Sequence, residues 1–167
     1  MPKVKKPKAN KTITNAGVFN PIGTKLRTAK RPAGNNNVQA LDVDSYINLK
    51  KREKVGDNLE HDHIPSSAAL KRAEEKRLGR KLTKQEAADL HNKANAIEVP
   101  KDVHAKSDTF RGKNTKQQIE DDAADLSKAA KRDYATTRAN LIAKGYSVKD
   151  VDAALDKLKA ENLKKGI

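Results

Sequence analysis

The stretch from Glu60 to Ser66, Glu-His-Asp-His-Ile-Pro-Ser, constrains the fold more than any other part of this chain. Residues 59–64 predict a short strand or extended segment, and Pro65 ends it because proline has no N–H to donate to a sheet. Ser66 or Ser67 then offers a hydroxyl that can cap a helix. The chain must therefore turn from an extended segment into a helix at a point that carries two of its four histidines.

Helix signals dominate the rest of the chain. Caps, glycines and apolar spacing predict helices over about 66–78, 83–94, 115–144 and from 147 onward, with a second strand within 96–100. The segment 41–52 predicts a short helix or strand that packs on the main body. We therefore expect a mostly α fold of the α+β class, with a small ββα-type core, added helices and a C-terminal helical hairpin.

The charge distribution divides the chain into two parts. Residues 1–40 hold nine Lys or Arg and no acid, and several prolines interrupt any regular element. We expect a flexible basic arm over 1–40, which either neutralises phosphates or links this chain to a larger protein. Residues 41–167 would form the folded domain, with a site core at about 58–114 and the helical hairpin at about 115–165.

Composition narrows the class of partner. The net charge of +14 suits an anionic partner, of which nucleic acid is the commonest. The absence of Cys excludes disulfides and thiolate-bound zinc. No stretch approaches the roughly 20 apolar residues of a membrane span, and the basic N-terminus lacks the apolar region of a signal peptide. If this protein leaves its cell, we expect another device to carry it.

The histidine cluster predicts phosphodiester hydrolysis. This reaction needs an activated water and neutralisation of phosphate charge, which a histidine base and one divalent cation can supply. We expect His63 to act as the general base, Asp62 to bind the metal, and His104 to be a second ligand. Mg²⁺ is the first candidate, with Zn²⁺, Ni²⁺ or Mn²⁺ as alternatives.

Other polar residues have less decided roles. His61 or Asn95 could add a ligand or orient one, and Glu60 is either a ligand or a surface charge. The basic loop that carries Arg111 and Lys113 would hold the phosphate. A solvated surface would also account for the His-Asp-His triplet, and His91 is better explained as structural or exposed than as catalytic. Ser66 is interpreted as a helix cap, since no Gly-x-Ser-x-Gly elbow surrounds it.

The segment Glu60-x-Asp62-His63-Ile64-Pro65 resembles the first strand motif of HNH, or ββα-metal, endonucleases. In that family the histidine activates water and the aspartate binds a single metal ion, which implies these roles for His63 and Asp62. A histidine or asparagine at the start of the next helix also binds the metal. His104, which follows the Ile-Glu-Val-Pro segment, is the matching candidate.

Residues from about 58 to 167 are also similar to C-terminal nuclease domains of bacterial polymorphic toxins, including Rhs, contact-dependent inhibition and type VI effectors. The shared motifs are Asp62 to Ser66, with Pro65 inside it, Ile97 to His104, and Ser107 with Thr109 beside the site. This resemblance implies an antibacterial toxin that acts in the cytoplasm of a target cell. It also implies a cognate immunity protein, which charge complementarity predicts to be acidic.

We therefore expect a metal-dependent endonuclease that cleaves DNA in preference to RNA. Two alternatives remain open on the sequence. One is a basic nucleic-acid-binding protein without enzymatic activity, which explains the charge but gives the histidine cluster no role. The other is an RNase toxin that uses His63 and His104 as an acid–base pair without metal.

Overall fold

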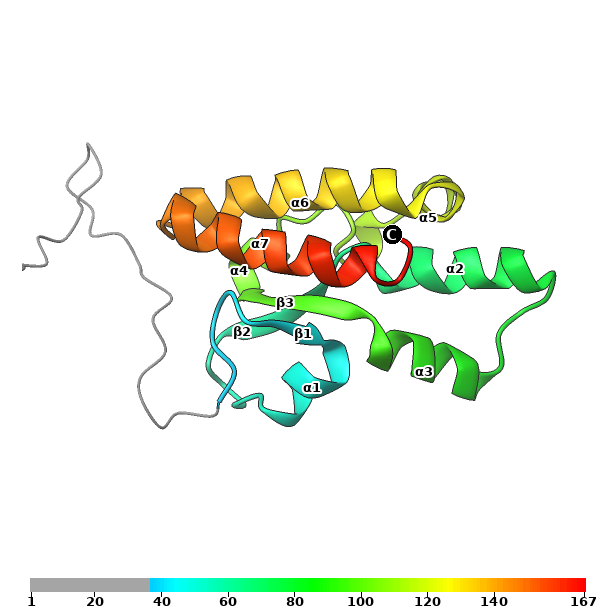
Figure 1. The fold of residues 1–167 in the computed structure, drawn as a ribbon, viewed down its shortest axis with the longest axis horizontal. Helices are drawn as coiled ribbons and strands as arrows, with labels where there is room; N and C mark the ends of the chain where they lie inside the picture. Colours follow the sequence, from blue (N-terminus) through cyan, green and yellow to red (C-terminus); the bar gives the residue numbers. More distant parts are fainter. Residues whose placement is uncertain (1–36) are drawn as a thin grey trace, which may run out of the picture.

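The computed structural model describes residues 37–167, in which helices surround one small antiparallel sheet (Figure 1). Its strands are β1 (Val43–Ser45), β2 (Leu59–His63) and β3 (Asn95–Pro100). The helices are α1 (Tyr46–Lys51), α2 (Ser67–Leu78), α3 (Lys84–Lys93), α4 (Lys101–His104), α5 (Lys116–Ala124), α6 (Leu126–Ala143) and α7 (Val148–Leu163), with a 3₁₀ turn η1 (Arg111–Lys113). The expected mostly α fold of the α+β class is confirmed.

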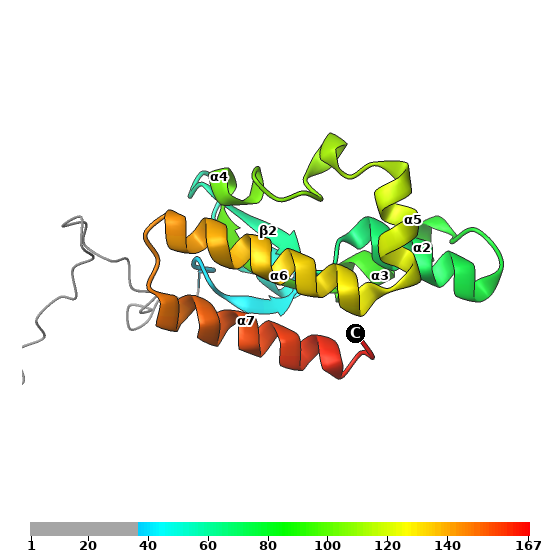
Figure 2. The same cartoon turned by 90° about the horizontal axis from the view of Figure 1, so that it is seen from above.

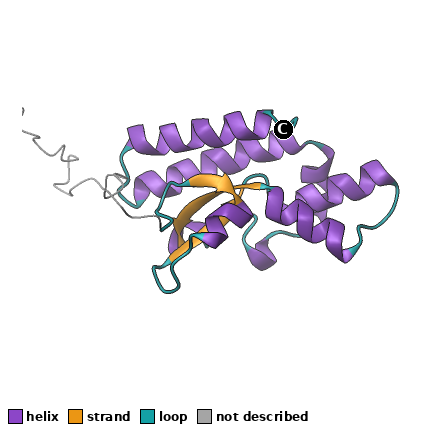
Figure 3. Ribbon diagram, turned by 60° about the horizontal axis from the view of Figure 1, so that its bottom comes forward, coloured by secondary structure: helices purple, strands orange, loops and turns teal. Residues whose placement is uncertain are grey.

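The sheet has the order β1-β3-β2, and both outer strands pair antiparallel with β3. β2 is therefore an edge strand. In its register with β3, Asp62 lies opposite Ile97 and Leu59 lies opposite Pro100, immediately before α4. The strands β2 and β3 with α4 thus form a strand–strand–helix unit, and α2 and α3 are inserted in the sequence between its two strands. Figure 3 shows the sheet in orange with helices around it.

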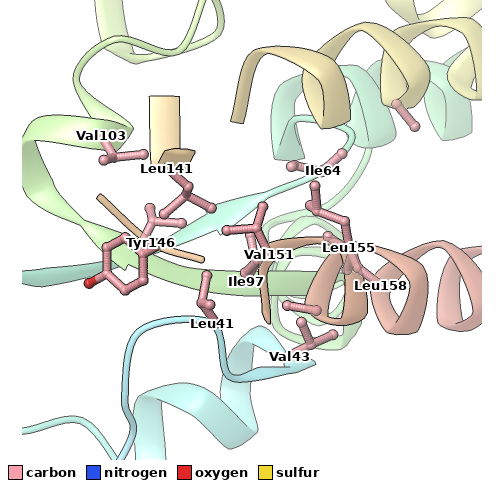
Figure 4. Close-up of a cluster of buried hydrophobic side chains, with 13 residues drawn as sticks. Leu41, Val43, Ile64, Ile97, Val103, Leu141, Tyr146, Val151, Leu155 and Leu158 are labelled. Carbon is pink, nitrogen blue, oxygen red and sulfur yellow. The ribbon is translucent and has the colours of Figure 1, made fainter. Parts of the chain in front are cut away.

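The hydrophobic core lies between the sheet and the α6–α7 hairpin, whose helices run side by side (Figure 2). Ile97 of β3 contributes to this core, as do Leu141 of α6 and Leu155 and Leu158 of α7 (Figure 4). Their side chains are at most 2% exposed. The opposite face of the sheet packs on α1, where Leu49, Ala96 and Val38 form a smaller cluster. The sheet is thus covered on both faces.

The helix caps follow the sequence signals in most places. Ser66 caps α2, which ends at Gly79 with φ +67, and Thr83 with Glu86 forms a complete capping box at α3. Ser147 caps α7, which folds back on α6 as the predicted hairpin. The segment 41–52 contains both a strand and a helix, and its sheet position makes three strands where the sequence predicted two.

One expectation is wrong. The single helix predicted over about 115–144 is two helices, α5 and α6, separated at Asp125. Asp125 has φ −148 and ψ 85, outside the helical region, and its carboxylate accepts a hydrogen bond from the Lys128 N–H. The aspartate thus caps α6 and lets the chain change direction, a role that continuous apolar spacing does not reveal.

The predicted basic arm lies almost wholly outside the described residues. Of its last four positions, Val38 is buried, and its N–H donates to the Arg52 carbonyl at 2.9 Å. Within residues 37–167, no helix combines the length and the apolar character needed to cross a membrane.

Candidate active site

Strand alternation divides the side chains of β2 between the two faces of the sheet. Glu60 and Asp62 lie on the face that α4 and α6 cover, where they contact His104 and Thr137. His61 and His63 lie on the other face, against Tyr46 of α1. The structure therefore brings Asp62 to His104 and places His63 on the opposite side of the strand.

On the first face, His104 lies between two carboxylates of β2. Its Nδ1 is 2.8 Å from Oε2 of Glu60, and its Nε2 is 3.5 Å from Oδ1 of Asp62. The strand register explains this arrangement. Pro100 at the end of β3 pairs with Leu59 at the start of β2, so α4, which follows Pro100, carries His104 beside Glu60 and Asp62. Glu60 therefore orients the imidazole, and the ring presents Nε2 to Asp62.

Asp62 is a carboxylate in an unfavourable environment. It is 4% exposed, and its Oδ2 accepts only a long, 3.5 Å hydrogen bond from the Thr137 hydroxyl. Burial raises its pKa to about 6, and the neighbouring His104 acts in the opposite direction, to lower this pKa. The negative charge of Asp133 on α6 raises it further. A cation beside Asp62 would stabilise its charged form.

His63 lies at the end of β2 in a group of aromatic rings. It stacks on Tyr46 with 4.8 Å between ring centroids and lies 4.5 Å from the ring of His91. Its Nε2 is 3.1 Å from the carbonyl oxygen of His91, so Nε2 carries the proton and Nδ1 keeps a lone pair. Burial lowers the pKa of His63 to about 4, which keeps the imidazole neutral at physiological pH.

His61 has the opposite electrostatic character. Its Nδ1 contacts the buried carboxylate of Glu98, and its Nε2 lies 3.2 Å from Glu53. Burial lowers the pKa of His61, but the two carboxylates outweigh this effect and raise it. The two carboxylates thus favour the charged form of His61, which suits an electrostatic partner better than a proton acceptor.

A polar pocket of about 370 Å³ opens where Glu60, His61 and His104 reach the edge of β2. Its lining residues come from α1, β2, α4 and the loop that follows α4, and include Glu60, His61, His104 and Arg111. Phe110 places its ring edge-on to His104 at 4.8 Å, and the Arg111 guanidinium lies 4.8 Å from the Phe110 centroid. Arg111 has φ +49, a left-handed conformation that is uncommon for a residue with a side chain.

The loop after α4 is connected to the junction after β2. Ser107 is buried, and its hydroxyl lies 3.0 Å from that of Thr109 and accepts from the Thr109 N–H. The Asn114 amide donates to the Ser66 hydroxyl at 3.3 Å, beyond the cis Ile64–Pro65 peptide. The hydroxyls of Ser66, Ser107 and Thr109 therefore help to hold the loop that presents Arg111, and Pro65 lies next to Ser66 in the chain.

Two residues singled out by sequence lie elsewhere. Asn95 donates to Oδ1 of Asn162 at 2.9 Å and accepts from Lys165 at 2.7 Å, so its amide belongs to the contact between β3 and α7. Lys113 donates to the Ala105 carbonyl at 2.7 Å and holds the loop rather than the pocket. His91 is structural, as interpreted from its helix, and its Nδ1 lies 2.8 Å from the Ser67 hydroxyl.

The chemistry of Asp62 and His104 fits a divalent cation. A carboxylate oxygen and an imidazole nitrogen facing one another are donor types for such ions, and Glu60 on the far nitrogen is the usual outer partner of a ligating histidine. Among residues 37–167, no group of three or more His, Cys, Asp or Glu is arranged to hold a metal ion. The described residues therefore offer a pair of ligands.

Four residues of this region were not found by sequence reasoning: Glu98, Thr137, Asp133 and Phe110. Glu98 lies within the predicted strand, and its position opposite His61 follows only once the register is known. Thr137 and Asp133 come from α6, distant in sequence, and Oδ2 of Asp133 is buried without a hydrogen-bond partner among the described residues. Phe110, one of only two phenylalanines, precedes the basic loop, and that rarity was a usable signal.

Comparison with known proteins supplies one relative. The chain is 51% identical over 130 residues to the protein named "Deoxyribonuclease CdiA" from Dickeya dadantii (strain 3937). The match covers 78% of this chain but only 4% of that much longer protein. No protein-family model matches the chain. No solved structure matches it.

Proposed function

We propose that this chain is a nuclease module of a longer antibacterial toxin and hydrolyses phosphodiester bonds in DNA. The observation that carries the proposal is the position of His104, held through Nδ1 by Glu60 and directed through Nε2 at the buried Asp62, beside a pocket that contains Arg111. The 51% identity to a protein named deoxyribonuclease supports DNA as the substrate.

The proposed class is HNH-like. The order β2, β3, α4 supports this proposal, with the Asp-His pair on the first strand, whereas His104 is the last residue of α4 and not at the start of the helix as the resemblance implies. Asp62 and His104 would hold one divalent cation, with Mg²⁺ the first candidate. When bound, the cation would stabilise the negative charge that develops on the phosphate and the leaving oxygen.

His63 is the proposed general base. The His91 carbonyl fixes its tautomer and leaves Nδ1 unprotonated, and the lowered pKa keeps the ring neutral. Because His63 lies on the opposite face of β2 from Asp62, the attacking water must reach the imidazole at the end of the strand. His61 lines the pocket but is held between two carboxylates, which makes it the matched control.

The remaining proposed roles concern binding. Arg111 would contact a phosphate oxygen, and its stacking on Phe110 holds the guanidinium beside His104. The net charge of +14 favours a polyanionic substrate and an acidic immunity protein that covers the same pocket. Within a longer toxin, this chain would be delivered to act in the cytoplasm of the target cell.

A nicking assay tests the proposal. Purified protein is incubated with supercoiled plasmid and, in parallel, with total RNA, each with Mg²⁺ and with EDTA. We expect Mg²⁺-dependent nicking of the plasmid, and loss of at least about 100-fold in rate for His63→Ala, because proton transfer by a positioned base contributes about that much or more. His104→Ala is expected to abolish Mg²⁺-dependent activity.

His61→Ala serves as the control and is expected to keep most of the activity. If His61→Ala abolishes nicking while His63→Ala retains it, the general base is His61 and the assignment of His63 is wrong. RNA cleavage that survives EDTA would indicate the metal-independent RNase instead. DNA binding without cleavage of either substrate would indicate a binding protein.

A further inference from the structure

A second pocket lies beside the first, along the same edge of β2. It has a volume of about 230 Å³ and lies at the turn over residues 54–58. The two pockets share four lining residues, Glu53, Leu59, Glu60 and His61, so the start of β2 forms the wall between them. Because β2 is the edge strand, nothing else in the sheet covers this wall.

Each of the two pockets, which together are called the double pocket, is lined by cations that form no ion pair with residues 37–167. Arg111 lines the first pocket, while Lys54 and Lys101 line the second. The backbone N–H of Lys101 donates to the Asn58 carbonyl at 3.0 Å, which fixes the start of α4 against the turn that carries Lys54. All three side chains are exposed, and none forms an ion pair with a residue in the range 37–167.

The carboxylates between them already have partners. Glu60 contacts His104, Glu98 contacts His61, and Glu53 contacts both His61 and Lys50. The fourth, Asp57, accepts from the Leu59 N–H at 3.0 Å. The cations without an ion-pair partner among residues 37–167 are therefore Arg111 in the first pocket and Lys54 with Lys101 in the second, and His104 lies in the first pocket.

We propose that the DNA strand lies along the edge of β2, with phosphates on both sides of the cleaved bond. Arg111 contacts the backbone on one side, and Lys54 with Lys101 contacts it on the other. The inference rests on the proposed function and adds a second phosphate-binding site, built from the 54–58 turn and the start of α4. A line of phosphate contacts sets the position of the strand without reading its sequence.

The salt dependence of DNA binding measures the number of phosphate contacts that the protein makes. Binding of a short DNA duplex to the full chain is measured by fluorescence anisotropy against KCl concentration, in EDTA so that metal-dependent cleavage does not interfere. For duplex DNA, log affinity decreases with log salt concentration, and the magnitude of this slope becomes smaller by about 0.9 for each lost phosphate contact. The double variant Lys54→Gln/Lys101→Gln is therefore expected to lose close to twice that value.

The matched control is Lys128→Gln/Lys131→Gln, which removes the same charge from exposed lysines of α6, outside both pockets. Its slope is expected to stay at the wild-type value. An unchanged slope for Lys54→Gln/Lys101→Gln, or an equal loss in the control, would overturn the proposal. The single variants Lys54→Glu and Lys101→Glu keep the test decisive if the double variant does not fold.

The two proposals fail differently. Wild-type protein that never nicks plasmid would contradict the nuclease, whatever the slopes. A wild type that nicks plasmid, with a slope that Lys54→Gln/Lys101→Gln leaves unchanged, would contradict only the second phosphate site.

Discussion

At the residue scale, one face of β2 holds two histidines with opposite electrostatic environments. His61 lies between carboxylates that raise its pKa, whereas burial lowers the pKa of His63 to about 4. The sequence made the motif visible and named Asp62, His63 and His104 as candidates. It could not show which residues meet, because the contact of His104 with Asp62 depends on the register of β2 with β3.

Asp62→Asn is expected to stabilise the protein at neutral pH while abolishing nicking. The folded-state pKa of Asp62 is raised from 3.8 to about 6, so wild-type stability is lost as pH rises through that interval. This corresponds to roughly 3 kcal/mol at pH 7, as an upper value. Asparagine carries no charge and avoids this cost.

Urea unfolding at pH 4 and at pH 7, without added metal, measures this difference. The two proteins should be nearly equal at pH 4, where the wild-type carboxyl is mostly protonated, and the variant should be the more stable at pH 7. His63 acts in the opposite direction, since its lowered pKa makes stability fall as pH drops below about 6.5. Its contribution is common to both proteins and cancels. A gain for Asp62→Asn that is the same at both pH values would contradict this account.

At the element scale, most boundaries follow from local chemistry. Thr83 and Ser147 cap helices at the residues their side chains indicate, and Gly79 and Gly145 end helices with φ +67 and +96. The boundary at Asp125 was missed because the apolar spacing continues from α5 into α6. Strand β1 was equally hard to identify, since its three residues gain a sheet partner only from β3.

Asp125→Ala is expected to destabilise the protein by about 1 kcal/mol, the usual cost of losing a helix N-cap. The carboxylate accepts from the Lys128 N–H at 2.8 Å, and alanine leaves that donor without its partner. Asp121→Ala is the control, because among residues 37–167 its carboxylate accepts only from the exposed Gln117 side chain at 2.8 Å. Urea denaturation should show a change within about 0.5 kcal/mol for this control. Equal stability of the two variants would mean that packing alone separates α5 from α6.

At the scale of the whole molecule, much of the net charge comes from outside the described residues. Among residues 37–167, the buried members of the main core lie between Leu41 and Leu158. Residues 1–36 carry nine cations and no acid, so without them the net charge falls from +14 to +5. Composition alone indicated a polyanionic partner, but the candidate site needed the sheet register, which no local pattern specifies.

A chain that begins at Asn37 is therefore expected to keep its stability and its Mg²⁺-dependent nicking at low salt, but to bind DNA more weakly at physiological salt. Thermal unfolding should give the same midpoint as the full chain, because the hydrophobic core is unchanged. The magnitude of the slope of log affinity against log salt should become smaller by about 0.9 for each phosphate that residues 1–36 contact. An unchanged slope would show that these cations do not touch DNA and would favour a linker role. A lower unfolding midpoint would show instead that the segment packs on the domain, since lost phosphate contacts alone cannot destabilise the protein in the absence of DNA.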